Sequence, residues 1–204
     1  MGEESCAGIV LAAGAGTRYG RPKVLAEGGA WLRGAVAALR DGGCGRVVVV
    51  LGATGPARRA ADGRWLVCDA PEIAIPEGAQ AVWAADWAVG LAASLRTGLA
   101  AVAESPAQFT VVMPVDTPDV GPDVVARVLA AGRAAPSGLA RAMFHNRPGH
   151  PVVLAHRHWS AVAGSAQGNF GARAFLDARP DIVAVTCDDL ATGRDHDYPA
   201  TRAP

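Results

Sequence analysis

Short apolar runs alternate along this chain with segments in which apolar residues recur at helical spacing. The runs predict strands that are buried on both faces of a sheet, and the periodic segments predict helices. The predicted strands are 8–11, 46–51, 65–68, 109–113, 139–144, 151–155 and 181–186, and the predicted helices are 31–40, 86–103, 122–133 and 169–178. Because strands alternate with helices, right-handed crossovers should build a mainly parallel sheet with helices on both faces. We therefore expect an α/β protein with three layers, α/β/α.

Capping, turn and aromatic residues refine this picture. Asp86 is the expected N-cap of the second helix, and Pro122 suits the first turn of the third. Residues 145–149 (HNRPG) predict a turn between two strands. Trp83 and Trp87 are interpreted as core aromatics, because large aromatic side chains are most often buried in packing.

Composition indicates a globular chain without a strong net charge. The chain has 204 residues and a mass of 20.7 kDa, half of its residues are hydrophobic, and no repeat or linker interrupts the pattern. This length can bury one sizeable core, so we expect one domain over residues 1–204. Nineteen basic residues balance nineteen acidic ones, which argues against a protein that coats nucleic acid or an anionic membrane.

The N-terminal segment and the cysteines predict a cytoplasmic protein. No basic region precedes the apolar stretch 8–13, which is far too short to span a bilayer, so we expect neither an export signal nor a membrane partner. The cysteines lie far apart, without a Cys-x-x-Cys pair that would suggest zinc or a redox motif. We expect buried thiols in a reducing compartment at Cys6, Cys44, Cys68 and Cys187.

The segment "LAAGAGTRYGRPK", residues 11–23, follows the first predicted strand and combines glycines with basic residues. A loop that leaves the carboxyl end of a parallel strand lies where α/β proteins bind nucleotides. Gly14 and Gly16 would let backbone amides approach a ligand, and Arg18 and Lys23 are cationic donors suited to a polyphosphate. The loop matches neither the Walker motif nor the Gly-x-Gly-x-x-Gly dinucleotide fingerprint. The alternative is a solvated surface loop.

The combination Leu-Ala-Ala-Gly-x-Gly-x-Arg-x-Gly-x-Pro-Lys resembles the signature of the MobA-like NTP transferases, the molybdenum cofactor guanylyl- and cytidylyltransferases. That family has the Rossmann-like, three-layer fold of the nucleotide-diphospho-sugar transferases, also called glycosyltransferase-A-like. The resemblance implies that Arg18 and Lys23 hold a triphosphate. It further implies nucleotide contacts from Leu11, Ala12, Ala13, Gly14, Gly16, Thr17 and Ser94.

Five further stretches extend the resemblance over nearly the whole chain: 90–99, 113–118, 149–152, 168–173 and 195–199. They resemble, in order, the family's base-selecting helix start, its magnesium-binding aspartate motif, two elements that face the acceptor and a closing Asp-x-Asp motif. The resemblance implies that Ser94 helps to select the base, that Asp116 binds magnesium, and that His150 and Asn169 contact the acceptor. The departures from the family pattern are Ala84, Asn169 and Tyr198.

Acidic residues after the buried strand 109–113 and near the C-terminus are candidate metal ligands. Asp116 follows that strand, and Mg²⁺ binds proteins through one or two carboxylates together with substrate phosphates. Asp195 and Asp197 are the next candidates, because residues two apart in an extended segment point to the same side. The alternatives are a turn or cap at Asp116 and a solvated, irregular tail over residues 188–204.

These patterns together predict a nucleotidyltransferase. A terminal phosphate on an acceptor would attack the α-phosphorus of an NTP and expel pyrophosphate, with Arg18, Lys23 and Asp116 as the catalytic residues and Mg²⁺ as the cofactor. The resemblance implies CTP or GTP as the donor, the molybdenum cofactor as the acceptor, and a molybdoenzyme or its chaperone as a further partner. CTP is favoured, because LAAG, SLRTGL and GHPV look more like the cytidylyl branch. A sugar-phosphate acceptor stays open.

Two alternatives come from other classes of protein. Asn169 and Tyr198 depart from the family pattern, which is compatible with a carrier that binds nucleotide or cofactor without turnover. A dinucleotide-dependent dehydrogenase is disfavoured by the missing fingerprint, and tight binding of NADH would revive it.

Overall fold

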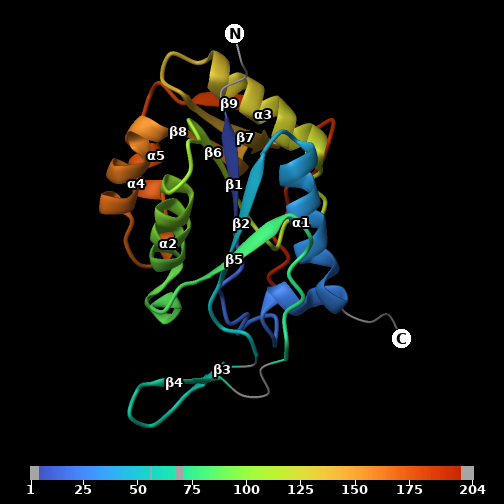
Figure 1. Ribbon diagram of the computed structural model, residues 1–204, viewed down its shortest axis with the longest axis vertical. Helices are drawn as coiled ribbons and strands as arrows, with labels where there is room; N and C mark the ends of the chain where they lie inside the picture. The colour runs from blue at the N-terminus through green and yellow to red at the C-terminus, as the bar shows by residue number, and fades with distance from the viewer. Residues whose placement is uncertain (1–4, 56, 68–70, 199–204) are drawn as a thin grey trace.

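A seven-stranded sheet organises the computed structural model, which describes residues 5–55, 57–67 and 71–198 (Figure 1). Its strand order is β5-β2-β1-β6-β8-β7-β9. The strands are β1 (Cys6–Leu11), β2 (Arg46–Leu51), β5 (Ala79–Trp83), β6 (Phe109–Pro114), β7 (Leu139–Phe144), β8 (Arg147–Ala155) and β9 (Val183–Thr186). Within this sheet β8 pairs antiparallel with both neighbours, and every other pairing is parallel. The expected mainly parallel sheet is confirmed.

Helices cover both faces of the sheet (Figure 1). The helices α1 (Ala30–Asp41) and α3 (Pro122–Ala134) pack on one face, and α2 (Leu91–Ala103), α4 (Trp159–Ser165) and α5 (Arg173–Asp177) pack on the other. Short 3₁₀ segments join these elements: η1 (Lys23–Gly29), η2 (Trp87–Val89), η3 (His156–His158) and η4 (Gly168–Phe170). The expected three-layer α/β/α architecture is therefore confirmed.

The valine run of β2 shows why the sheet is buried on both sides. Val47 and Val49 join the core formed with α1 and α3, whereas Val48 and Val50 join the core formed with α2. Each of these side chains is at most 1% exposed. Successive side chains of a strand point to opposite faces, so a continuous apolar run requires a helical layer on each face.

The second predicted helix begins later than the sequence indicates. Asp86 makes no capping hydrogen bond to it; α2 starts at Leu91, after the short segment η2 and Gly90. Gly90 has a φ of 128°, and a Cβ there would lie 2.6 Å from the backbone carbonyl of Gly168. The backbones of Gly90 and Gly168 approach each other closely at the break in the predicted helix, and α2 begins at Leu91.

The hairpin between β7 and β8 is tighter than predicted. His145 and Asn146 alone form the loop, both with positive φ, as in the two-residue turns that match the twist of a hairpin. Strand β8 therefore begins at Arg147 instead of residue 151. Its prolines are accommodated because the pairing register shifts between Arg141 and Met143.

Several other elements differ from the sequence prediction. Residues 65–68 were expected in the main sheet, but β4 (Trp65–Val67) pairs with β3 (Ala57–Arg59) in a separate hairpin that projects from the carboxyl edge (Figure 1). The edge strand β5 and the short helix α4 were not predicted. Helix α5 and strand β9 are shorter than the predicted 169–178 and 181–186.

The aromatic and cysteine predictions are partly confirmed. Trp83 is 55% exposed at the end of the edge strand β5, so its interpretation as a core residue is wrong. Cys6, Cys44 and Cys187 are buried free thiols, as expected, and Cys68 lies outside the described residues. In the described ranges every helix is too short or too polar to cross a membrane.

Close packing of α2 on the sheet generates a stability prediction. A Cβ at Gly98 would lie 2.7 Å from Ile9 Cγ2 and 3.0 Å from Val50 Cγ2, whereas Gly34 in α1 has open space around it. The variant Gly98→Val should lower the free energy of unfolding by about 1–3 kcal/mol through overpacking. The matched variant Gly34→Val should change it by less than about 0.5 kcal/mol. Urea unfolding measures both, and equal effects would contradict the packing described here.

Candidate active site

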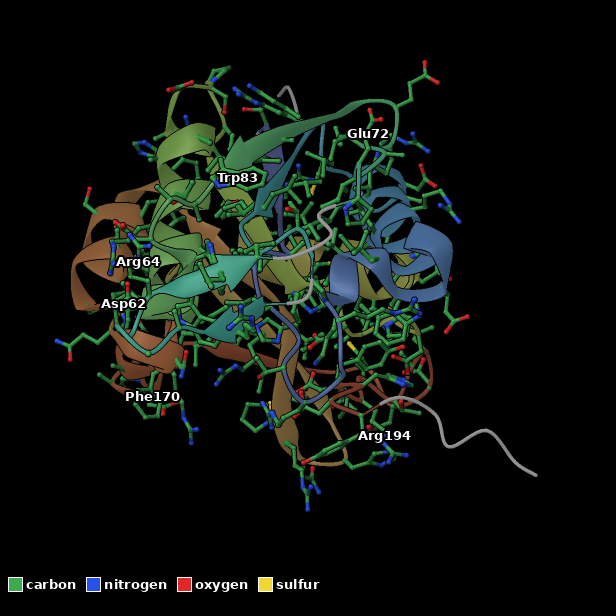
Figure 2. All side chains as sticks on the ribbon, turned by 90° about the horizontal axis from the view of Figure 1, so that it is seen from below. Asp62, Arg64, Glu72, Trp83, Phe170 and Arg194 are labelled. Atoms are coloured by element: carbon green, nitrogen blue, oxygen red, sulfur yellow. The ribbon has the colours of Figure 1, made fainter. Side chains whose placement is uncertain are left out.

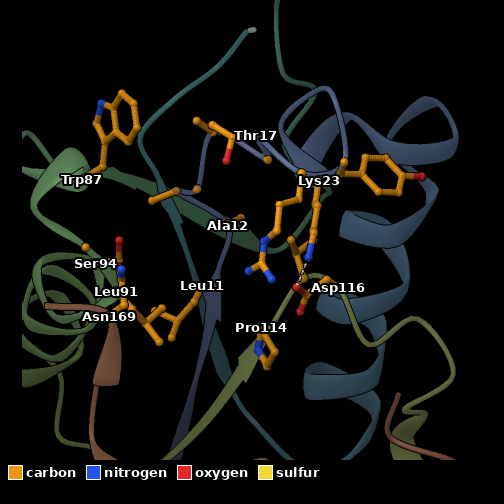
Figure 3. A pocket seen from close by; sticks show the side chains of 18 of the residues that line it. Leu11, Ala12, Thr17, Lys23, Trp87, Leu91, Ser94, Pro114, Asp116 and Asn169 are labelled. Atoms are coloured by element: carbon orange, nitrogen blue, oxygen red, sulfur yellow. Dashed lines mark hydrogen bonds and ion pairs between the residues drawn. The ribbon is translucent and has the colours of Figure 1, made fainter. Parts of the chain in front are cut away.

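A cavity of about 480 Å³ opens at the carboxyl ends of β1 and β6. Every residue assigned to nucleotide binding from the sequence lines it: Leu11, Ala12, Ala13, Gly14, Gly16, Thr17, Arg18, Lys23 and Ser94. Figure 3 shows Trp87, Ser94 and Asn169 along one side, and Lys23 with Asp116 along the other. The structure thus brings the separate motifs of the sequence into one cleft, which we call the nucleotide cavity.

The loop after β1 is held by backbone hydrogen bonds at its start and by a glycine turn at its middle. The amide of Ala12 donates to Val50 O at 3.0 Å, and the amide of Ala53 donates to Ala13 O at 2.9 Å. Gly16 has a φ of 60°, and a Cβ there would overlap the carbonyl of Arg21. This turn therefore requires glycine, which explains how the loop can fold back over the cavity.

A network of ion pairs connects the loop to the opposite wall. Lys23 Nζ lies 2.6 Å from Asp116 Oδ2 and 2.8 Å from Asp197 Oδ1, and Arg18 Nη1 lies 2.8 Å from Asp197 Oδ2. The side chains of Lys23 and Asp116 are only 15% and 19% exposed. This network contains two cations and two carboxylates, so its charges balance. A polyphosphate could take the place of the carboxylates as the partner of Arg18 and Lys23. A divalent cation could take the place of Arg18 and Lys23 as the partner of the carboxylates.

The network shifts the pKa values of its members in opposite directions. Burial would lower the pKa of Lys23, but its hydrogen bonds to Asp116 and Asp197 raise that pKa above its ordinary value. The hydrogen bond from Lys23 lowers the pKa of Asp197. Burial and the nearby Asp116 carboxylate raise the pKa of Asp195. The ionised form is therefore less favoured at Asp195 than at Asp197.

Asp116 has one carboxylate oxygen that no hydrogen bond satisfies within the described residues. Its Oδ1 is shielded from solvent and has no hydrogen-bond partner among the described residues. A carboxylate oxygen in that state fits a cation, because desolvation without a partner is costly. Within the described ranges no three His, Cys, Asp or Glu side chains form a ready-made metal cage. Mg²⁺ does not require one, since it binds through one or two carboxylates plus phosphates and water.

The remaining predicted residues lie in an adjoining cavity of about 460 Å³. His150 and Asp195 line this second cavity, and Asn169 lines both cavities. Burial and the nearby Arg141 guanidinium lower the pKa of His150 to about 4, so the imidazole is neutral at pH 7. The neutral imidazole of His150 can donate one hydrogen bond and accept another there, but it contributes no charge.

The start of α2 forms the wall that faces the loop. Ser94 lies in its first turn and is 4% exposed, while Gly90 and Leu91 also line the nucleotide cavity. The first amides of a helix have no partner within the helix, and the N-terminus carries a partial positive charge. This wall adds hydrogen-bond donors opposite the cationic loop.

Sequence reasoning missed the aromatic residues of the cleft. Trp65 of the β3–β4 hairpin lines the nucleotide cavity and lies against Trp87, with ring centroids 5.6 Å apart. Trp87, interpreted as a core residue, is partly buried and lines the same cavity. No local pattern identifies this pair, because the hairpin reaches the cleft through tertiary contacts.

The C-terminal segment reaches the cleft through anchors that the sequence does not reveal. Asp119 Oδ2 accepts hydrogen bonds from the hydroxyl and amide of Thr192, at 2.6 and 2.7 Å. The amide of His196 donates to Asp116 O at 3.1 Å, and its ring packs on Trp31. These contacts position Asp197 beside Lys23, so this part of the predicted polar tail belongs to the cleft.

The mainly parallel sheet, with a glycine-rich cationic loop opposite carboxylates, defines a nucleotide-binding α/β protein. The model of the MobA-like NTP transferase domain matches residues 8–183. The chain therefore belongs to the MobA-like NTP transferase family of nucleotidyltransferases, which confirms the resemblance seen in the sequence.

Individual relatives cover nearly the whole chain. Nicotine blue oxidoreductase of Paenarthrobacter nicotinovorans is 34% identical over 201 residues, which cover 93% of this chain and 91% of that protein. The structure of Rv0371c from Mycobacterium tuberculosis H37Rv has a TM-score of 0.72 at 24% identity, over 97% of this chain and 95% of that one. A nucleotidyl transferase from Methanothermobacter has a TM-score of 0.68 at 18% identity, over 91% and 88%. These structures confirm the glycosyltransferase-A-like fold.

The opposite pKa shifts of two neighbouring aspartates generate a pH prediction. The variant Asp197→Asn should lower the free energy of unfolding at pH 7 by up to about 1 kcal/mol. The loss is small because the ion pair between Asp197 and Lys23 is partly exposed to solvent. A lowered pKa stabilises the fold above the unfolded-state value of about 3.9, and this contribution is lost as the pH falls through the folded-state value. The difference from wild type should therefore shrink below about pH 4.

Asp195→Asn is the matched control. The pKa of Asp195 is raised, so its ionised form opposes folding, and the variant should be as stable as wild type or slightly more stable at pH 7. Urea unfolding at several pH values measures both variants. Equal losses in the two variants at pH 7 would contradict the assignment of the ion pairs to Asp197.

Proposed function

We propose that this protein transfers a nucleoside monophosphate from an NTP to a phosphorylated small molecule. An oxygen of the acceptor phosphate attacks the α-phosphorus, the bond from that phosphorus to the β-phosphate bridging oxygen breaks, and pyrophosphate leaves. No nucleophilic side chain is required, since positioning and charge neutralisation supply the catalysis in this kind of reaction.

The observation that carries the proposal is the convergence of Arg18, Lys23 and Asp116 in one cleft. In the proposed complex Arg18 and Lys23 leave the carboxylates and bind the triphosphate, because phosphate oxygens offer them several charge-assisted hydrogen bonds. The loop backbone from Ala12 to Gly16 lies against the nucleoside. Ser94 and the first amides of α2 contact the same ligand from the opposite wall.

A divalent cation, Mg²⁺ in this proposal, would be held by Asp116 and Asp197, with Asp195 as a further candidate. The unpartnered Oδ1 of Asp116 supports this choice. When bound, such a cation neutralises phosphate charge during the transfer. Rv0371c has been determined in a complex with manganese, so Mn²⁺ should be assayed beside Mg²⁺.

The donor proposed is CTP and the acceptor proposed is the molybdenum cofactor, on the basis of the sequence motifs. GTP and sugar-phosphate acceptors are the alternatives within the same reaction class. A molybdoenzyme or its chaperone would then receive the product. His150 and Asn169 are proposed to contact the acceptor, because both line the cavity that adjoins the nucleotide cavity.

Pyrophosphate release with a panel of NTPs, each with Mg²⁺ and molybdenum cofactor, tests this function. We expect turnover with CTP, and the variant Asp116→Asn should reduce it at least about 100-fold, as loss of one preorganised electrostatic group does elsewhere. Asp123→Asn, an exposed acidic residue at the start of α3, should leave turnover unchanged. An active Asp116→Asn enzyme would remove Asp116 from the mechanism. NTP binding without any turnover would instead favour the carrier.

A second candidate function follows from the relative named nicotine blue oxidoreductase. The same cleft would bind a reduced nicotinamide dinucleotide through its pyrophosphate, and a hydride would pass from the nicotinamide to a planar organic acceptor, which takes up a proton from solvent. The aromatic pair Trp65 and Trp87 in the cavity is compatible with planar ligands.

Calorimetry with NADH and NADPH tests the second candidate. Under it, wild type should bind a reduced dinucleotide, and Arg18→Gln should weaken that binding about tenfold by removing a charge-assisted contact to the pyrophosphate. Arg64→Gln, at the tip of the β3–β4 hairpin outside the cavity lining, is the matched charge control (Figure 2). If neither NADH nor NADPH binds, this candidate is excluded. Pyrophosphate release from an NTP would support nucleotidyl transfer instead.

A further inference from the structure

The second cavity contains an incompletely paired arginine. Arg141, on β7, lines this cavity, and its side chain is 17% exposed. Its Nε is shielded from solvent and has no hydrogen-bond partner among the described residues. The nearest carboxylate oxygen that pairs with it, Asp177 Oδ1, lies 3.9 Å from Nη1, too far for a hydrogen bond. The guanidinium therefore has donors that the fold leaves unused.

The surroundings of Arg141 leave its charge poorly compensated. Asp177 is 55% exposed and also pairs with Arg173, whose Nε lies 3.2 Å from Asp177 Oδ2. His150, on the neighbouring strand β8, supplies no counter-charge, because an imidazole is either neutral or positively charged. Burial lowers the pKa of Arg141, but a guanidinium stays protonated in proteins. A buried cation without a close partner destabilises the fold unless a ligand supplies the negative charge.

The rest of the second cavity combines an apolar floor with the polar side chains of His150, Asn169, Arg173, Asp177 and Asp195. Its floor consists of buried side chains from α2, the sheet and α5, namely Leu95, Val112, Val152, Leu154 and Leu176. Phe170 of η4 also lines it and is 68% exposed; Figure 2 shows this ring at the surface of the molecule. A concave apolar site with a few polar groups is typical of small-molecule binding.

The second cavity adjoins the nucleotide cavity. Leu11, Leu91 and Asn169 line both. A molecule in the second cavity would therefore lie beside a nucleotide in the first, on the side of β6 away from β1.

We propose that Arg141 anchors an oxyanion, phosphate or carboxylate, on the acceptor substrate, whose apolar or aromatic body lies on the leucine and valine floor. The fork of a guanidinium suits such groups because it can donate two parallel hydrogen bonds. That the bound molecule is the acceptor substrate rests on the proposed function, whereas the anion site at Arg141 does not depend on it. Arg141 thereby becomes a specificity-determining residue that selects acceptors with a charged group opposite the reacting end.

The test uses three small aromatic probes and isothermal titration calorimetry without NTP or metal. Phenyl phosphate and benzoate carry the two kinds of oxyanion, and benzamide is the neutral probe. Arg141→Gln should weaken the preferred anion at least about tenfold and leave benzamide unchanged, since a hydrogen bond to a charged group is lost. Arg173→Gln, which removes an exposed charge from the same cavity, should weaken it less than about threefold. Equal losses in the two variants, or no loss in Arg141→Gln, would overturn the proposal.

Two further measurements keep the result interpretable. The double variant Arg18→Gln with Lys23→Gln should bind phenyl phosphate as wild type does; if it alone loses binding, the probe lies in the triphosphate seat and the proposal fails. A crystal structure of wild type with phenyl phosphate covers the case in which Arg141→Gln does not fold. An oxyanion on the Arg141 guanidinium supports the proposal, and one found only at Arg18 and Lys23 overturns it.

These outcomes separate the anion site from nucleotidyl transfer. Failure to release pyrophosphate from any NTP would remove the proposed reaction but leave the binding of phenyl phosphate at Arg141 intact. Turnover that is lost only in Asp116→Asn, with no anion bound at Arg141, would remove the anchor but leave the reaction.

Discussion

The ammonium group of Lys23 connects the segments on which the whole cleft depends. It binds Asp116 after β6 and Asp197 in the C-terminal segment, while Lys23 itself follows the loop of β1. Two carboxylates would otherwise face one another without a counter-charge, and the Lys23 ammonium supplies it. Because Lys23 and Arg18 pair with these carboxylates, the charges of the group are balanced in the absence of any ligand.

The sequence predicts the centre of this fold better than its edges. The valine run of β2 and the strands β1 and β6 are buried on both faces, and a continuous apolar run has few other structures available. The edge strand β5 is half exposed, with Gln80 and Trp83 facing solvent, so its residues carry no clear period. The break at Gly90 depends on the backbone of Gly168, which lies 78 residues away in sequence and cannot be inferred locally.

The candidate site divides in the same way. The cationic loop and Asp116 were predictable, because they follow buried strands whose carboxyl ends meet at one edge. Trp65 and Arg141 were not, since one is carried by a hairpin outside the main sheet and the other lies on a strand that looks like ordinary half-buried sheet. Trp65 matters because it contacts Trp87 in the cavity, and Arg141 matters because its Nε has no hydrogen-bond partner among the described residues. Neither property can be inferred from a sequence pattern.

The family and the named relative point to different chemistries, and the residues of the cleft discriminate between them. Hydride transfer from a dinucleotide needs a pyrophosphate seat and a planar pocket, but it has no use for two carboxylates beside the phosphates, which would repel them. In the proposed transfer of a nucleotidyl group those carboxylates would hold a cation, which would offset the charge of donor and acceptor together. Asp116, with one oxygen unpartnered, and Asp197, held in place by the anchored C-terminal segment, are costly features for a dehydrogenase and useful ones for a nucleotidyltransferase. The cleft therefore favours nucleotidyl transfer.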